Sequence, residues 1–283
     1  MLSNSTSPLI FYLLEYGYGF ERFPTNYDLR TLLRAFLEFV NDDEIITYDI
    51  TEVVDVYYNT IDEKQIYDEI VNIYTYEFEI GDKFIILTEG TTDIYMLENS
   101  LKLLYPHLVE FYSFMDFGNS NASGSASSLV TSIKSFIGAG FKNKIIAIFD
   151  NDTAAEEAKR GLAKTKIPDN IKILNYPNLK FAENYPTIGP TGESTFNVNG
   201  LAGSIEIYLG EETLTKNGKF IPVHWKGYNQ SLNKYQGEIL EKEEIQNKFK
   251  IKIEKCRENA KLINEYDWSG IKEIFKVIFN AFN

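Results

Sequence analysis

The sequence predicts an α/β fold with a mostly parallel sheet flanked by helices, between an N-terminal helical segment and a helical C-terminal tail. Between residues 82 and 180, short apolar runs typical of buried strands alternate with helical patterns, and such alternation implies right-handed crossovers between parallel strands. Helical periodicity prevails before and after this region. We therefore expect an acidic helical segment over 1–80, an α/β domain over 81–210 and a lysine-rich C-terminal helical region over 211–283.

In the N-terminal segment, Thr25 or Asn26 can cap a helix whose apolar residues recur at helical spacing from Leu32 to Val40. A second helix is expected over residues 63–74. The Gly81-Asp82 pair then interrupts the pattern and marks a plausible boundary.

The α/β region is expected to contain four strands and three helices. Each apolar run is followed by a helix signal or a turn signal, and glycines or a proline mark the helix ends. The expected strands are 84–87, 109–115, 145–149 and 171–174, and the expected helices are 91–104, 126–136 and 153–164. A small polar loop over 118–125 precedes the second of these helices, and residues 181–235 are rich in Gly, Pro and Asn.

Composition narrows the class of protein. A hydrophobic content of 44% supports a packed core, and the single cysteine, Cys256, allows no intramolecular disulfide and no cysteine-based zinc site. Without a signal-peptide pattern or an apolar run of membrane-spanning length, the sequence favours a cytoplasmic protein without a membrane partner. The net charge of −13 comes mainly from residues 1–80, which hold 4 basic and 16 acidic side chains. The rest is near neutral and can carry a local basic face.

Acidic side chains follow two of the expected strands directly. Glu89 follows the first strand, with Asp93 one turn later, and the Asp150-x-Asp152 pair follows the third. Ligands of open α/β sheets bind at the carboxyl ends of the strands, and hard carboxylate oxygens suit one or two Mg²⁺ or Mn²⁺ ions. The spacing therefore predicts metal-assisted chemistry on phosphates. Taken singly, each acidic residue could also be an ordinary helix N-terminus.

The segments Ile-Leu-Thr-Glu-Gly-Thr-Thr-Asp (86–93) and Ile-Phe-Asp-Asn-Asp (148–152) resemble the Toprim domain over about residues 82–180. The resemblance implies a Toprim-like sheet, a general acid/base role for Glu89, and Mg²⁺ binding by Asp150 and Asp152, which together form the expected catalytic set. It also places Asp93 at a position that OLD-family nucleases use for a second metal.

A second element, Ser-Ile-Glu-Ile-Tyr-Leu (204–209), resembles the segment that follows the Toprim core in OLD-like defence nucleases, where the glutamate joins the metal site. That implies Glu206 as a further metal ligand, although it can equally be an exposed residue of a short helix. The whole arrangement is similar to bacterial HEPN/Toprim-associated proteins of phage defence. The Arg–His spacing of HEPN ribonucleases is missing, because neither His107 nor His224 has an arginine at the required distance upstream.

Four residues beside the acidic positions can contact phosphate or nucleic acid. Gly90 permits a tight turn with backbone N–H groups facing an anion, and Thr91 begins a helix. Lys159 and Arg160 lie on the helix after the acidic pair, where a solvated face explains them as well.

The resulting expectation is a divalent-metal-dependent nuclease acting on DNA or RNA in phage defence, with a defence partner protein and with a homo-oligomer left open. Two other functions remain. One is a catalytically inactive Toprim module that regulates through protein–protein contacts, and the other is a maturase-like RNA processor. The sequence does not choose between DNA and RNA.

Overall fold

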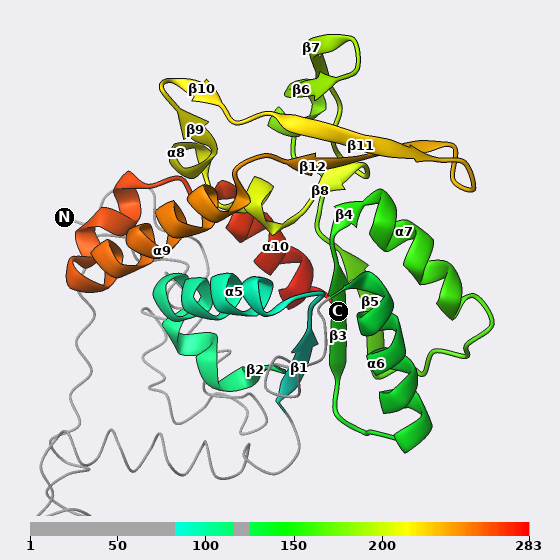
Figure 1. The fold of residues 1–283 in the computed structure, drawn as a ribbon. Helices are drawn as coiled ribbons and strands as arrows, with labels where there is room; N and C mark the ends of the chain where they lie inside the picture. Colours follow the sequence, from blue (N-terminus) through cyan, green and yellow to red (C-terminus); the bar gives the residue numbers. More distant parts are fainter. Residues whose placement is uncertain (1–82, 116–124, 283) are drawn as a thin grey trace, which may run out of the picture. The chain divides into compact units, whose positions relative to one another are not determined.

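A parallel four-stranded sheet organises the first half of the described chain (Figure 1). The computed structural model describes residues 83–115 and 125–282. The strand order is β2-β1-β3-β5, and β1 pairs in parallel with both β2 and β3. The elements of this part are β1 (Phe84–Leu87), α5 (Thr91–Leu104), η2 (Pro106–Phe111), β2 (Tyr112–Phe114), α6 (Ala126–Ala139), β3 (Ile145–Phe149), β4 (Asn151–Asp152), α7 (Thr153–Lys159), η4 (Arg160–Leu162) and β5 (Ile171–Asn175).

Helices cover both faces of this sheet. Because successive side chains of a strand point to opposite faces, Ile86, Ile146 and Ile148 pack against the side that carries α5 and α10 (Ser269–Phe279). Ile85 and Phe149 point to the opposite face of the sheet and pack against α6 and α7, as do the other alternate residues of β1 and β3. Figure 1 shows these two helix layers on either side of β3. The predicted mixed α/β class with a parallel sheet flanked by helices is confirmed.

A second four-stranded sheet, of order β12-β11-β6-β7, follows in the chain. Its core is the hairpin of β11 (Val223–Asn229) and β12 (Lys234–Ile239), which forms the long yellow-to-orange ribbon in Figure 1. The other elements here are η5 (Phe181–Asn184), β6 (Tyr185–Gly189), β7 (Gly192–Phe196), β8 (Ala202–Gly203), η6 (Ile205–Tyr208), α8 (Glu211–Leu214), β9 (Thr215–Lys216) and β10 (Lys219–Phe220).

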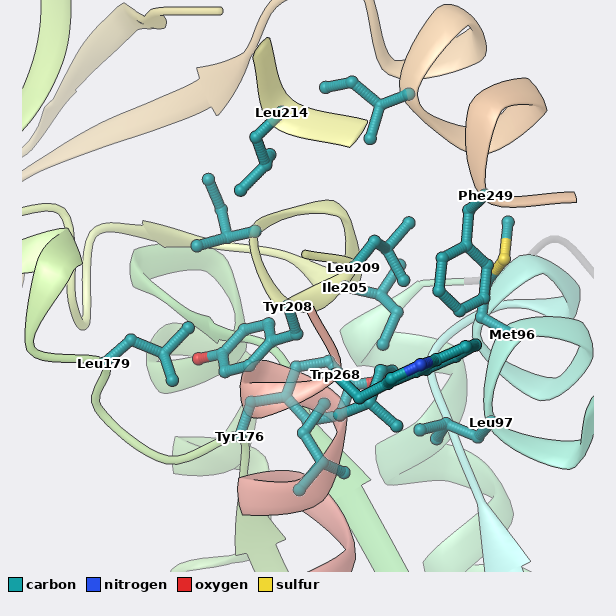
Figure 2. Close-up of a cluster of buried hydrophobic side chains, with 14 of the residues drawn as sticks. Met96, Leu97, Tyr176, Leu179, Ile205, Tyr208, Leu209, Leu214, Phe249 and Trp268 are labelled. Carbon is teal, nitrogen blue, oxygen red and sulfur yellow. The ribbon is translucent and has the colours of Figure 1, made fainter. Parts of the chain in front are cut away.

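The remaining helices close one large core. After α9 (Lys242–Glu258) and η7 (Ala260–Glu265), α10 returns to the parallel sheet. Figure 2 shows the centre of this core, where Tyr208 lies beside Tyr176 and the Trp268 indole lies below Phe249. All four side chains are at most 3% exposed. This core links η6, α9 and the segment before α10. It therefore holds η6, which contains Glu206, in position.

Several element predictions need correction. Residues 106–111 form a 3-10 helix because Pro106 starts a new turn there, so the second strand is only Tyr112–Phe114. The expected C-terminal helical region is helical from Lys242 onward, whereas strands occupy much of 215–239. The N-terminal helices, residues 1–80, and most of the polar loop over 118–125 lie outside the described residues. The proposed domain boundaries stay a prediction. In the described chain, no helix is long and apolar enough to cross a membrane.

Candidate functional site

The carboxyl ends of β1 and β3 carry the predicted acidic residues. Glu89 leaves β1 and accepts a hydrogen bond from the backbone N–H of Asp150 through Oε1 at 2.9 Å. That contact bridges the ends of the two strands. Asp152 caps α7, since its Oδ1 accepts from the N–H of Ala155 at 2.7 Å. Glu89, Asp150 and Asp152 are half-buried.

Two further acidic residues lie deeper. Asp93, 7% exposed, accepts a 2.8 Å hydrogen bond from the Tyr176 hydroxyl. Glu206 is 3% exposed. Its Oε2 accepts from the Ser204 hydroxyl at 2.6 Å, and its Oε1 accepts from the Gln246 amide at 2.7 Å. The alternative of an exposed Glu206 on a short helix is therefore wrong.

The structure brings all five acidic residues into one carboxyl cluster, with Asp150 at its electrostatic centre. Burial raises the pKa of Asp150 well above its usual range, and the charges of the other four members raise it further. One oxygen of Asp150, Oδ1, is buried and has no hydrogen-bond partner.

The pKa values of other members of the carboxyl cluster are raised as well. Burial raises the pKa of Glu89 to about 7, with Asp152 and Asp93 adding repulsion. Burial raises the pKa of Asp93 to about 6, although the Tyr176 hydrogen bond opposes this, and burial also raises the pKa of Asp152. The cluster is thus partly neutral near pH 7, where a protonated carboxyl donates a hydrogen bond instead of repelling an anion.

Two lysines moderate the negative field. Lys159 is half-buried and hydrogen-bonded to Asn175, and burial lowers its pKa despite nearby Glu156 and Glu89. Lys242 has its pKa raised, because attraction to Glu206 and Glu238 outweighs the effect of burial. The predicted contact residue Arg160 is exposed and instead binds Ser231 of the β11–β12 turn.

Gly90 and Thr91, the residues of the β1–α5 turn that were expected to contact phosphate, lie beside the cluster. Gly90 precedes the first residue of α5, and the exposed Thr91 begins that helix. A Cβ at Gly90 would lie 3.1 Å from Asp93 Oδ2, so the carboxyl of Asp93 occupies the space beside the turn.

Sequence reasoning missed several residues of this site. Asn175 ends the neighbouring parallel strand β5, and its amide donates to the carbonyl oxygen of Asp150 at 2.7 Å. The rule that found Glu89 and Asp150 could have found Asn175. Tyr176 and Lys242 carried no such signal, because they meet the cluster only through tertiary packing.

Five of the ten carboxylate oxygens of the cluster accept hydrogen bonds from protein groups described above. Among residues 83–115 and 125–282, no group of three or more His, Cys, Asp or Glu side chains is arranged to hold a metal ion. The geometry offers instead a set of buried and half-buried acids with raised pKa values around Asp150, whose Oδ1 is buried without a partner.

Comparisons with known proteins give one informative match. The chain is 30% identical over 233 residues to a ribosomal RNA large subunit methyltransferase K/L of Buchnera aphidicola subsp. Acyrthosiphon pisum (strain APS). The match covers 79% of this chain and 30% of the relative, so the chain spans about a third of the length of that protein. No protein-family model matches, and no solved structure matches.

This match contradicts the expected function. The relative is a methyltransferase, so the expectation of a divalent-metal-dependent nuclease, a hydrolase of phage defence, is corrected. The expected Mg²⁺ or Mn²⁺ cofactor is corrected as well, both by the relative and by the absence of a metal-holding group among the described residues. Neither the expected defence partner nor a homo-oligomer gains support.

Proposed function

We propose that this chain is an RNA-binding domain of an RNA-modifying protein and that RNA meets it at the carboxyl cluster. The relative is named for its action on large-subunit ribosomal RNA. The cluster lies at the carboxyl ends of β1 and β3, where open α/β sheets bind their ligands. The observation that carries the proposal is Asp150 Oδ1, a buried hydrogen-bonding atom without a partner. Such an atom is costly to leave unpaired, and a polar group of RNA would satisfy it once the groups that cover it move aside.

An acidic site can meet a polyanion only if its charge is suppressed. Burial and mutual repulsion raise the pKa values of the cluster and so favour its neutral forms, and the charges of Lys159 and Lys242 act on the same site. A protonated carboxyl can donate to a phosphate oxygen or to a ribose 2′-hydroxyl. The same acids suit proton transfer at neutral pH, since a group with a pKa near 7 is an efficient general acid or base.

Because the relative is a methyltransferase, we ask whether the described residues could bind S-adenosylmethionine. A nucleoside in an open α/β sheet occupies the crevice where the strand order reverses, approached by a glycine-rich turn. Here that crevice lies between β1 and β3, and the Glu89–Asp150 hydrogen bond bridges it. The adjoining turn contains one glycine, Gly90. The carboxyl of Asp93 already fills the space beside its Cα, where a ligand would have to approach. The described residues therefore do not fit this cofactor, and we assign no methyl-transfer step to them.

The finer fold assignment is also a proposal. The strand order β2-β1-β3-β5 is compatible with a Rossmann-like or a Toprim-like sheet. We favour the Toprim-like description because Glu89 follows β1 and the Asp150-x-Asp152 pair follows β3, as the sequence resemblance implies. An experimental structure whose strands superpose better on a Rossmann-like sheet would overturn it.

Charge addition beside the cluster tests the proposed function. Thr91 is exposed at the start of α5, where an aspartate is favourable for the helix, so Thr91→Asp should fold normally. If RNA binds at the cluster, this variant should bind a large-subunit ribosomal RNA fragment roughly three- to tenfold more weakly at low salt. Fluorescence anisotropy with labelled RNA measures the change.

Thr131→Asp is the matched control, because Thr131 is exposed within α6. It adds the same charge and should leave RNA affinity unchanged. Equal affinity of both variants and wild type would place RNA elsewhere, and no RNA binding by wild type would reject the proposed function.

A further inference from the structure

We propose that the aromatic row of Phe196, Trp225, Tyr235 and Tyr228 is a stacking platform for unpaired RNA nucleotides. The inference rests on the proposed RNA-binding function and names the form of RNA that the domain takes. Proteins that hold single-stranded nucleic acid combine aromatic rings with nearby cations, and both occur on the second sheet.

The four rings form one continuous series across strands β7, β11 and β12. Trp225 lies 5.5 Å from Phe196 and 5.7 Å from Tyr235, and Tyr235 lies 5.1 Å from Tyr228, measured between ring centroids. Phe196, Tyr228 and Tyr235 are 46%, 49% and 51% exposed. Three of the four rings are thus about half exposed to solvent, and Trp225 is half-buried between them.

The backbone leaves room for the central ring. Trp225 lies between Gly189 of β6 and Gly237 of β12, where a Cβ would come within 3.2 Å of indole Cδ1 and 2.9 Å of Cζ3, respectively. A register shift between Trp225 and Gly227 interrupts the regular alternation of β11. Tyr228 is consequently paired with Tyr235, beside the ring of Trp225. Several local features therefore combine to expose these rings together.

The aromatic row adjoins the carboxyl cluster. The hydroxyl of Thr153 donates to the carbonyl oxygen of Tyr235 at 2.6 Å, and Thr153 directly follows Asp152. The N–H of Gly237 donates to the carbonyl oxygen of Leu201, next to the residue that pairs with Asp152. The backbone that carries the row is therefore joined directly to the segment that contains Asp152.

The chemistry of the surface favours nucleic acid over protein. The row contains no exposed large aliphatic side chain. Among the described residues, the exposed large aliphatic residue is Ile251, which lies on α9. Lys226 and Lys234 lie on the same hairpin as three of the rings, on the face opposite the row, and Arg160 binds Ser231 in its turn. The two lysines pair with Glu238 at 3.0 Å and Glu156 at 2.5 Å in half-exposed ion pairs. Such pairs contribute little to stability. Breaking them so that the lysines can bind phosphate would therefore cost little free energy.

Binding of a 12-nucleotide oligouridine by the full chain tests the row. The double variant Tyr228→Ala/Tyr235→Ala should bind roughly tenfold or more weakly than wild type. Phe141→Ala is the control, because Phe141 is 44% exposed but packs on Phe136 of α6, away from the row. It should bind as wild type does. Circular dichroism and thermal melting verify that each variant is folded.

Tyr228→Phe/Tyr235→Phe provides a second readout, since it keeps both rings and should retain affinity. Oligouridine should also bind more tightly than an RNA duplex of equal length. The row is rejected if RNA binds but all variants match wild type, or if the duplex binds more tightly, and the proposed RNA binding then still stands. If no RNA binds, both inferences are rejected. If, in addition, the alanine variants alter self-association in sedimentation, the row is a protein contact.

Discussion

At the scale of single residues, the Glu89–Asp150 contact defines the site. One side-chain oxygen of Glu89 takes the N–H of Asp150 and bridges two parallel strands. The same packing removes water from both carboxyls, so the contact that holds the site together also raises their pKa values. Structure and protonation are therefore linked at this position.

The raised pKa of Glu89 predicts a pH-dependent stability. Its pKa is about 7 in the folded chain against 4.5 ordinarily, so the folded state binds more protons between these values. The free energy of unfolding should fall as pH rises from about 4.5 to about 7 and level off above. Glu89→Gln should remove about 1–3 kcal/mol of that decline. Urea denaturation at several pH values measures it.

Glu183→Gln serves as the control for this prediction, because Glu183 is an exposed residue of η5. It should follow the wild-type pH profile. A wild-type stability that rises between pH 5 and 7, or a Glu89→Gln profile identical to wild type, would contradict the assigned protonation.

The five clustered acids were predictable at this scale, as was Asn175, whereas partners such as Tyr176 were not. Glu89, Asp150 and Asp152 are identified by the strands that they follow, since parallel strands end at one edge. Tyr176 donates to Asp93 across 83 positions of sequence, and no local pattern encodes a contact of that kind. The direction of the pKa shifts depends on burial by such distant residues, so it needed the structure.

At the scale of elements, Lys252 of α9 ties three segments together. Its side chain is 2% exposed, and Nζ donates to the carbonyl oxygens of Leu209 and Asp267 at 2.9 and 2.5 Å. Nζ also lies 2.6 Å from Glu212 Oε1 and 4.0 Å from the ring centroid of Trp268. The ammonium therefore joins α9 to α8, η6 and the segment before α10.

Removing this ammonium should destabilise the fold. Lys252→Met keeps the apolar stem but leaves Glu212 and two carbonyl groups without their partner. We expect a loss of about 2–4 kcal/mol in the free energy of unfolding, measured by urea denaturation. Lys255→Met, on the exposed side of the same helix, should change it by less than about 0.5 kcal/mol. Equal effects of the two changes would contradict the linking role of Lys252.

The second sheet shows why some elements escaped prediction. Its glycines, at positions such as 189, 192, 227 and 237, normally indicate turns. In the structure Gly189 and Gly237 lie within strands and make space for the Trp225 ring. A strand signal was nevertheless present in the apolar and aromatic residues of Val223–Asn229 and Lys234–Ile239. Tertiary packing of Trp225, Val223 and Ala202 against these glycines outweighed the local preference of glycine.

At the scale of the described part of the molecule, two sheets meet at the carboxyl cluster. The parallel sheet supplies Glu89 and Asp150, while β8 pairs with β4, which contains Asp152, and the β12 backbone binds beside it. The aromatic row and the carboxyl cluster are thereby neighbouring surfaces. The similarity to the methyltransferase covers 30% of that relative.

The most direct test of RNA binding at this junction is photo-cross-linking of the full chain to RNA containing 4-thiouridine, followed by mass spectrometry of the linked peptides. The account predicts cross-links in the β1–α5 turn, in α7 and in the β11–β12 hairpin. Cross-links confined to α9, α10 or residues 1–82 would contradict it.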